Sequence, residues 1–374
     1  MLSRRQFLRQ GVLSMLGAAG TALALPGKED RETLPDGSAS SGMITPETET
    51  AIERGLAYLA RSQDREGAFG TGHYQNNVAV TSLAAMAFMA GGHLPGRGSF
   101  GRVVTRALEF VLAQGDQRGT TSPLHPAGFL HNSIGPYQHG PMYGHGFGTL
   151  FLAELYGMVS DPSLRERLRR VLPRAVQVIL NAQNHEGGWR YTQQPRDADI
   201  SVTICQIMAL RSARNAGFFV PKARVDKCVA YVKACQNPAG WFVYQRTNLR
   251  GFPMNNQAFA RTAAGVCALY SAGLYHGREI EAGLRYLLSN PPSGTRHYPL
   301  DMHYFYGHYY AVQAMWTAGG EYWAKWFPAI REELRERQRK PEGCWFDVNC
   351  NHYGTAMACI ILQVPNNYLP ILQK

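Results

Sequence analysis

Charged residues are scarce in this chain of 374 residues: they make up 17% of it, while hydrophobic residues make up 45%. This shortage of charge excludes a coiled coil, which needs far more. Glycine and proline are plentiful but not periodically spaced, which excludes a collagen-like helix. The chain also lacks any apolar run of the roughly 18–20 residues that a membrane-spanning helix requires. What remains is the composition of a globular protein that can bury a large core.

Cysteine is also sparse, and its pattern argues against a disulfide-stabilised domain. The seven cysteines are an odd number, and no two of them have Cys-x-x-Cys spacing. Cys205, Cys267 and Cys359 lie within apolar, helix-like runs, where buried free thiols are common. The sequence therefore predicts no disulfide framework.

Basic residues outnumber acidic residues by 38 to 27, which gives a net charge of +11. The basic runs at 165–174 and 331–340 contain glutamate and fit the outward faces of helices. Motifs for nucleic-acid binding are absent, so we expect no nucleic-acid partner. The excess charge favours solubility or attraction to anionic surfaces.

The N-terminal segment resembles a twin-arginine export signal. The run Ser3–Arg9, which reads SRRQFLR, precedes a mildly apolar stretch that ends at Leu25. The resemblance implies export to the periplasm or another extracytoplasmic space, with an uncleaved anchor or a frayed helix as alternatives. The expected organisation is a signal peptide at 1–25, a flexible linker at 26–46 and a single domain at 47–374.

An internal repeat dominates the rest of the chain. An amphipathic helix ends in glutamine, and a glycine and an aromatic residue follow it after a short gap. Two weaker copies are centred on Gln114 and Asn290. The four clear copies run from Gln63 to Phe69, from Gln183 to Trp189, from Gln236 to Trp241 and from Gln338 to Trp345.

A second helix, rich in Ala, Leu and Met, follows each copy. The first helix of a pair is charged on one face, as in 51–61, and is expected to face outward. The second is apolar nearly all round, as in 80–89, and is expected to be buried. Six such pairs without polar capping repeats predict a closed, all-α (α/α)6 toroid. The second helices align on Thr81, Thr149, Thr203, Thr262, Tyr310 and Thr355.

The Gln-x3-Gly-x-Trp pattern resembles the QW repeat of squalene–hopene cyclases and the repeats of protein prenyltransferase β subunits. The chain is thus similar to the prenyltransferase/squalene oxidase repeat family, as an exported member with one toroid. The resemblance implies that the glutamine and the aromatic residue tie the end of one outer helix to the next repeat. These residues are therefore expected to be structural.

A ring of polar residues is predicted where the inner helices begin. Inner helices of a toroid run parallel, so their N-termini, each with a partial positive charge, meet at one mouth. The residue four before each alignment position shares its helix face. It is polar in five of six helices, namely Asn77, His145, Asp199, Tyr306 and Asn351, with Ala258 as the exception. Neighbouring candidates for a central cavity are Gln257, Arg261, His303, Tyr304, His308 and His352.

Convergent polar groups at a concave mouth favour a ligand site, although Asn and Asp are also common helix caps. The run from Asp197 to Thr203 resembles the D-x-D-D-T-A motif of class II terpene cyclases, in which the middle aspartate protonates an alkene. Asp197 and Asp199 match its first two acids, and Ile200 replaces the third. A helix N-terminus favours the carboxylate, so we expect a lowered pKa and an ionised Asp199. The candidate catalytic residues are Asp199, Asp197, His145, Tyr306 and His308.

Metal ligands with the Asp-x-Cys spacing of prenyltransferases are missing, so we expect neither a metal nor another cofactor. The nearest sets are Asp347, Cys350 and His352, and Asp301, His303 and His308. The long segment from Thr120 to Tyr143 carries His125, His131 and His139 and is predicted to be a lid or a surface loop.

Two functions remain open at this point. The first is an exported binding or scaffold protein that holds a small-molecule or polymeric ligand in a polar and aromatic cavity. The second is an acid–base enzyme that uses Asp199, either terpene cyclase-like or a polysaccharide lyase or hydrolase. The sequence leaves the oligomeric state and the identity of the ligand undetermined, because function resides in the site and not in the fold.

Overall fold

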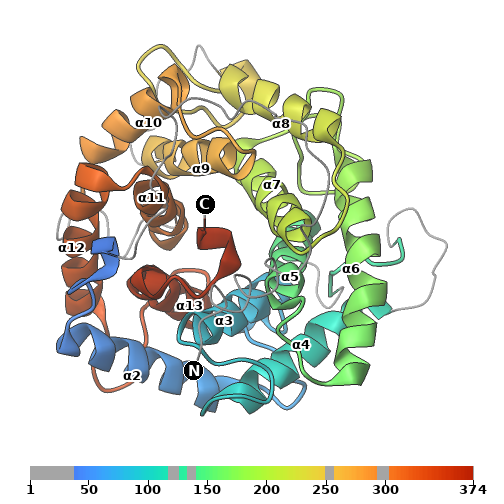
Figure 1. The fold of residues 1–374 in the computed structure, drawn as a ribbon, viewed down its shortest axis with the longest axis vertical. Coiled ribbons are helices and arrows are strands. Elements are labelled where there is room, and N and C mark those ends of the chain that lie inside the picture. Colours follow the sequence, from blue (N-terminus) through green and yellow to red (C-terminus); the bar gives the residue numbers. More distant parts are fainter. Residues whose placement is uncertain (1–37, 117–125, 133–139, 249–256, 293–302, 374) are drawn as a thin grey trace, which may run out of the picture. The chain divides into compact units, whose positions relative to one another are not determined.

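The computed structural model describes residues 38–116, 126–132, 140–248, 257–292 and 303–373. Within these residues it contains twelve α-helices, five short 3₁₀ turns and no strand, only isolated bridges (Figure 1). The predicted signal peptide, most of the expected linker, His125 and His139 lie outside this part of the chain. No helix in the described residues has the length and apolar character to cross a membrane.

Outer and inner helices alternate along the chain. The outer helices are α2 (Pro46–Ser62), α4 (Gly101–Asp116), α6 (Pro162–Ala182), α8 (Lys222–Ala234), α10 (Arg278–Leu288) and α12 (Gly320–Arg337). The inner helices are α3 (Val78–Ala90), α5 (Pro141–Leu155), α7 (Ile200–Asn215), α9 (Gln257–Ser271), α11 (Tyr304–Ala318) and α13 (Asn351–Gln363). Each inner helix contacts the next, and α13 contacts α3, so the inner ring closes (Figure 1). The expected (α/α)6 toroid is therefore confirmed.

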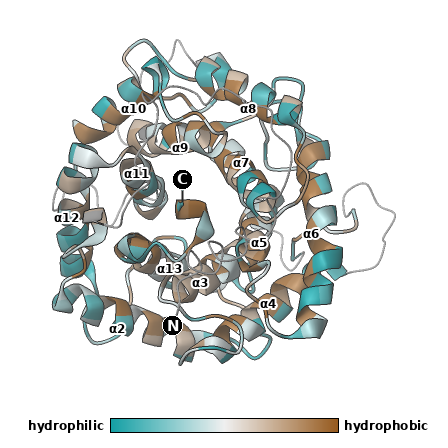
Figure 2. Cartoon of the chain, in the orientation of Figure 1, coloured by the Kyte–Doolittle hydropathy of each residue, from teal (hydrophilic) through white to brown (hydrophobic). Residues whose placement is uncertain are grey.

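Hydropathy explains which helix of each pair lies inside. Every residue of α3 except Ala79 is buried, as its nearly continuous apolar sequence predicts. The outer helix α6 buries Leu168, Val171 and Leu172 and exposes arginines on its other face. Figure 2 shows this alternation of hydrophilic and hydrophobic residues around the outer ring. One-sided burial fixes the outer helices against the inner ring.

A repeated hydrogen-bond arrangement, here called the glutamine clamp, joins successive repeats. The Nε2 group of the repeat glutamine donates to the carbonyl of its own repeat glycine and to a carbonyl of the next outer helix. In the second clear copy, Gln183 donates to Gly187 and to Arg224, both at 2.8 Å. Gln63, Gln236 and Gln338 make the same two bonds at 2.8–3.0 Å, to acceptors on Val103, Glu279 and Ala51 in the next helices. Since Ala51 belongs to α2, the bond from Gln338 ties the last outer helix to the first.

The repeat glycines are required by close backbone approach. Gly187 has φ of +97°, and a Cβ placed on it would lie 2.3 Å from the carbonyl oxygen of Lys227 in α8. Gly343 has φ of +79°, and its Cβ would lie 2.7 Å from the carbonyl oxygen of Arg54 in α2. No side chain fits such contacts with another backbone. Glycine thus lets each turn sit directly on the next outer helix.

Within each clear copy, the repeat aromatic residue is also hydrogen-bonded to the threonine on which the inner helices were aligned. The hydroxyl groups of Thr81, Thr203, Thr262 and Thr355 accept hydrogen bonds from the backbone N–H groups of Phe69, Trp189, Phe242 and Trp345. In the third clear copy the buried aromatic is therefore Phe242, and the prediction of Trp241 was wrong by one residue. The motif is Gly-x-aromatic, and Trp241 occupies the x position, where it is only partly buried.

Among the described residues, the two weaker copies do not form the clamp. There Gln114 donates to Phe110 in its own helix, and Asn290 donates to Tyr286. The glycine of the second repeat is Gly128, whose Cβ would lie 2.4 Å from the Cβ of Arg174 in α6. The chain between Gln114 and Gly128 is thus an insertion that separates glutamine from glycine.

Part of the expected linker belongs to the fold. Ala39 accepts a hydrogen bond from Nε1 of Trp323, and Met43 accepts one from Arg331, so residues 38–45 pack on α12. At the other end of the chain, residues 369–373 enter the centre of the ring (Figure 1). All seven cysteines are buried and unpaired.

The revised motif makes a stability prediction. Trp189 is fully buried and its Nε1 donates to Ile179 at 2.7 Å, so Trp189→Ala should lower the free energy of unfolding by about 3–5 kcal/mol. Trp241→Ala, the matched control, should cost about 1 kcal/mol, because Phe242 fills the structural position. Denaturant unfolding measures both values. Equal losses in the two variants would contradict the Gly-x-aromatic assignment.

Candidate functional site

The two ends of the inner ring have different structures. Side chains near the C-terminal ends of α5, α7 and α11 all bond to residues 371–373 of the C-terminal segment. The opposite ends hold Asp199 and most of the other predicted polar residues. Across that end, the Tyr306 hydroxyl at the start of α11 donates to the Ser201 carbonyl at the start of α7, at 3.4 Å. These helices therefore run in the same direction, and we call the end that holds their N-termini the tyrosine end.

Asp199 is the N-cap of α7, as the helix-cap alternative predicts. One carboxylate oxygen accepts a hydrogen bond from the N–H of Val202 at 2.9 Å. The other accepts one from Arg190, also at 2.9 Å. The Asp199 side chain has no exposed surface, so both oxygens are engaged within the protein.

Arg190 organises the groups around Asp199. Its guanidinium contacts Asp197 at 3.4 Å, donates to the Tyr244 hydroxyl at 2.8 Å, and lies over the rings of Tyr191 and Tyr244. The hydroxyls of Tyr191 and Tyr244 also bond to each other. The five residues Arg190, Tyr191, Asp197, Asp199 and Tyr244 form one network, here called the arginine cluster.

The backbone explains why these residues meet. The turns after Trp189 and Phe242 lie over the N-termini of the inner helices that precede them. The Tyr191 carbonyl accepts from the N–H of Met142 in α5, and the Tyr244 carbonyl accepts from the N–H of Ile200 in α7. Each turn thereby satisfies an N–H group that a helix start leaves free. The same turns place Tyr191 and Tyr244 beside Asp199.

The pKa of Asp199 contradicts the expectation from the helix end. Burial raises the pKa of this carboxyl from 3.8 to about 6, against the lowering effects of the Val202 N–H group and Arg190. Removing the carboxylate from water therefore outweighs the helix N-terminus. Asp199 is protonated in part near neutral pH, and the expectation of a lowered pKa was wrong.

Three tyrosines occupy the same position in their helices. Tyr143, Tyr306 and Tyr353 are the third residues of α5, α11 and α13, and each is partly exposed. Burial raises the pKa of each phenol well above its usual value, and the first two also lie within electrostatic reach of Asp199. Further inside the ring, the Tyr310 hydroxyl meets Sγ of Cys205 at 3.3 Å. Tyrosine hydroxyls and rings thus surround the arginine cluster.

Two predicted catalytic histidines lie elsewhere. His145 is fully buried, accepts a hydrogen bond from the Leu130 N–H at 3.1 Å and donates to the Ala175 carbonyl in α6 at 3.0 Å. It takes the place of the missing clamp in the second repeat. His308 packs against Phe259, Tyr304 and Trp326 at the boundary with α12. Burial lowers the pKa of both imidazoles to about 3.

The predicted cavity-binding residues are divided between capping and packing. Asn77 caps α3 through the N–H of Val80, and Asn351 accepts from the N–H of Asp347. His352 is buried against Tyr58 and Phe69 and accepts from the N–H of Gly70 at 2.9 Å. The remaining three are Tyr304, whose hydroxyl donates to Glu333, His303, whose ring lies near Tyr306, and Arg261, which lies within electrostatic reach of Tyr244.

Arg190, Tyr191, Tyr244, Tyr143 and Tyr353 were not predicted from the sequence. A signal for two of them exists, because Tyr191 and Tyr244 each follow the repeat aromatic by two residues. Aligning the repeats on the aromatic, and not only on the threonine, would have brought them together. In the described residues no group of three or more His, Cys, Asp or Glu side chains is placed to hold a metal ion.

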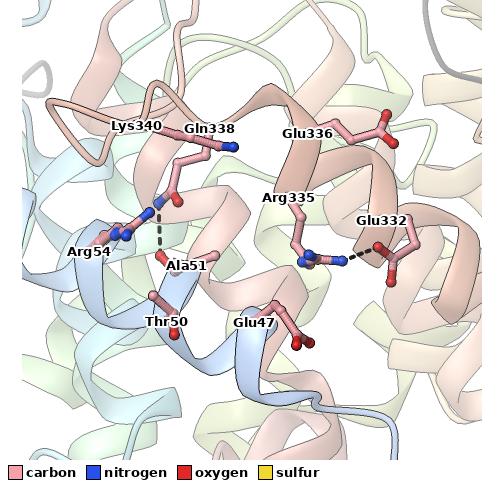
Figure 3. Close-up of a pocket in the computed structure, with 9 residues that line it drawn as sticks. All are labelled: Glu47, Thr50, Ala51, Arg54, Glu332, Arg335, Glu336, Gln338 and Lys340. Carbon is pink, nitrogen blue, oxygen red and sulfur yellow. Dashed lines mark hydrogen bonds and ion pairs between the residues drawn. The ribbon is translucent and has the colours of Figure 1, made fainter.

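A pocket of about 350 Å³ lies between the outer helices α2 and α12, where the ring closes (Figure 3). It is lined by three acidic and three basic side chains, so their charges balance, and Arg335 pairs with Glu332. The bond from Gln338 to Ala51 forms part of its wall. None of the predicted site residues lines this pocket, which marks the seam of the ring and not the candidate site.

The raised pKa of Asp199 predicts a pH dependence of stability. Because the pKa of Asp199 is raised in the folded state, the protonated carboxyl stabilises the fold fully below pH 3.8. This stabilisation is lost as the pH rises through about 6. Asp199→Asn keeps the cap but does not titrate. Between about pH 4.5 and 7.5, the variant should gain roughly 2 kcal/mol of unfolding free energy relative to the parent. Denaturant titrations at several pH values measure this difference, and a constant difference would contradict the raised pKa.

No protein-family model and no curated protein matches the sequence. Solved structures do match the fold. The type II terpene cyclase MstE from Scytonema has 16% identity and a TM-score of 0.56, over 87% of this chain and 100% of that chain. The α-1,6-mannanase GH76A of Salegentibacter has 8% identity and a TM-score of 0.57, over 86% and 99%. A D-mannose isomerase has 13% identity and a TM-score of 0.57, over 87% and 98%. At these identities the likeness establishes the shared (α/α)6 toroid and nothing finer.

Proposed function

We propose that this protein binds a polyhydroxylated, saccharide-type ligand at the tyrosine end of the inner ring. The observation that carries the proposal is a group of five partly exposed tyrosines at this end. They are Tyr143, Tyr191, Tyr244, Tyr306 and Tyr353.

A tyrosine offers a ring face and a hydroxyl at the same time. A sugar ring presents apolar C–H faces and many hydroxyls, so it uses both. A hydrocarbon uses only the ring face and would leave the phenol hydroxyls unsatisfied on burial. The linked hydroxyls of Tyr191 and Tyr244, with Arg190 behind them, offer donors and acceptors suited to sugar hydroxyls.

The carboxylates favour binding over hydrolysis. Glycoside hydrolysis uses two carboxyl groups that flank the scissile bond. In the arginine cluster only Asp197 is accessible, with 54% of its side chain exposed, whereas Asp199 has none exposed. Asp199 therefore holds Arg190 in place and acts as a positioning residue.

The structural matches are consistent with either kind of ligand. The mannanase has been captured with α-1,6-mannotriose, and the terpene cyclase with geranylgeranyl dihydroxybenzoate as its substrate. The same fold thus accommodates saccharides and prenyl compounds, and the side chains of this chain support the former. A saccharide ligand is also compatible with the extracytoplasmic location that residues 3–9 lead us to propose.

A second candidate function is acid–base catalysis by Asp199. The observation in its favour is the pKa of about 6, which suits proton transfer near neutral pH. This function requires the Asp199 carboxyl to leave Arg190 and reach a substrate. Asp199→Asn would then abolish turnover, whereas under the binding function it loosens Arg190 and only weakens binding.

Binding measurements on the full chain test the proposal. We expect isothermal titration calorimetry to detect binding of α-1,6-mannotriose or another oligosaccharide of a neutral panel, and no binding of geranylgeraniol. Tyr244→Phe keeps the ring and removes one hydroxyl, so it should weaken oligosaccharide binding by about 5–20-fold. Tyr368→Phe, which alters an exposed tyrosine near the C-terminus, is the matched control and should bind as the parent does.

The opposite pattern would overturn the proposal. If the prenyl alcohol binds and no oligosaccharide does, the tyrosine end accepts hydrocarbons. If Asp199→Asn abolishes conversion of a ligand that still binds, the second candidate function holds.

A further inference from the structure

The end of the inner ring opposite the tyrosine end is occupied by the chain's own C-terminal segment. Residues 369–373, here called the tail, lie among the C-terminal ends of α5, α7 and α11 (Figure 1). Side chains from all three helices bond to backbone groups of the tail. Glu154 accepts from the N–H of Ile371 at 3.0 Å, the Trp316 indole donates to the Leu372 carbonyl at 3.0 Å, and Arg211 donates to the Gln373 carbonyl at 3.0 Å.

Two apolar side chains complete the contact. Leu369 and Leu372 are 3% and 6% exposed, and they are three residues apart. Recognition of backbone groups in three successive residues, with buried leucines at i and i+3, is the way a protein binds a short peptide. We propose that this end of the ring is a peptide-binding site, that the tail is its resident and detachable ligand, and that the charge on Glu154 controls release.

The partners of Glu154 make it suited to this role. Its second oxygen accepts from the Ser212 hydroxyl at 2.5 Å, so the carboxyl joins α5, α7 and the tail. Burial raises the pKa of Glu154 to about 7, and Ser212, the Ile371 N–H and Arg211 oppose this rise. Tyr309 of α11 also lies within its electrostatic reach. Arg211 is the one charged group among these partners of Glu154. Its guanidinium donates hydrogen bonds to the carbonyls of Tyr270 and Gln373.

The direction of the pH effect follows from the raised pKa. A carboxyl whose pKa is raised in the closed state favours that state while protonated, and this preference is lost as the pH rises through about 7. Release of the tail returns Glu154 to water and to its usual pKa. Between about pH 5.5 and 8.5 the equilibrium should shift toward release by roughly 30-fold.

Hydrogen exchange on the full chain tests the mechanism of release. After correction for the intrinsic exchange rate, the opening constant of the Ile371 amide should rise roughly 30-fold from pH 5.5 to 8.5, while amides in the middle of α7 remain protected. Glu154→Gln can accept from the Ile371 N–H through its amide oxygen and donate to the Ser212 hydroxyl through its amide nitrogen, but it has no charge, so it should abolish the pH dependence. A pH-independent opening constant in the parent, or the same rise in Glu154→Gln, would overturn the role of Glu154.

Peptide binding tests the site itself. In a full-chain variant with Leu369→Asp and Leu372→Asp, which empties the site, a labelled peptide with the sequence LPILQK should bind at pH 5.5 and roughly 30-fold more weakly at pH 8.5, because it meets the same Glu154 carboxyl as the tail. Fluorescence polarisation measures both affinities. A peptide with aspartate at both leucine positions is the matched control and should not bind. If LPILQK does not bind this variant at pH 5.5 although the Ile371 amide of the parent exchanges by local opening, the peptide-binding site is disproved. Exchange of that amide only through global unfolding would disprove a detachable tail.

Discussion

The structure depends on one repeated contact: a glutamine amide nitrogen that donates to two backbone carbonyls at once. Only the side-chain amides of Asn and Gln, and charged groups, offer two N–H bonds on one nitrogen, and Gln has the reach to cross from one helix end to the next. The carbonyls belong to a glycine turn and to the following outer helix, so each clamp fixes the spacing between consecutive repeats. The clamp at Gln338 then fixes the last repeat against the first, and the ring closes without capping repeats.

Closure of the ring gives its two ends different chemistry. At one end, the turns that follow the clamp lie over the helix N-termini and present Arg190, Tyr191 and Tyr244 beside Asp199. At the other end, the helix C-termini present Glu154, Arg211 and Trp316, which hold the tail. The first end carries the proposed saccharide site and the second carries the proposed peptide site. Both ends contain a buried carboxyl whose pKa burial raises toward neutrality.

The sequence predicts the fold well because the fold rests on periodic signals. The apolar second helices and the Gln–Gly–aromatic spacing recur in phase, and the alignment threonines Thr81, Thr203, Thr262 and Thr355 prove to be equivalent in space. The signal is lost where an insertion separates Gln114 from Gly128. There His145 supplies the missing connection, which the sequence alone cannot distinguish from a catalytic histidine.

The candidate site is predicted only in part, and the reasons are physical. Asp199 and Tyr306 were found because they occupy a fixed position before the alignment residues. Arg190 and Tyr244 were missed because they lie on turns, where helical periodicity gives no information. The pKa of Asp199 was predicted in the wrong direction because a helix N-terminus can be read from a sequence, whereas the complete burial of a carboxyl depends on tertiary packing.

Ring closure by the clamp is tested most directly by Gln338→Ala, which removes both bonds of the clamp between α12 and α2. Gln177→Ala, at an exposed position of the outer helix α6, is the matched control. We predict that Gln338→Ala lowers the free energy of unfolding by about 2–3 kcal/mol, since it leaves a buried carbonyl without its donor, and that Gln177→Ala changes it by less than about 0.5 kcal/mol. Equal stabilities for the two variants would contradict the account.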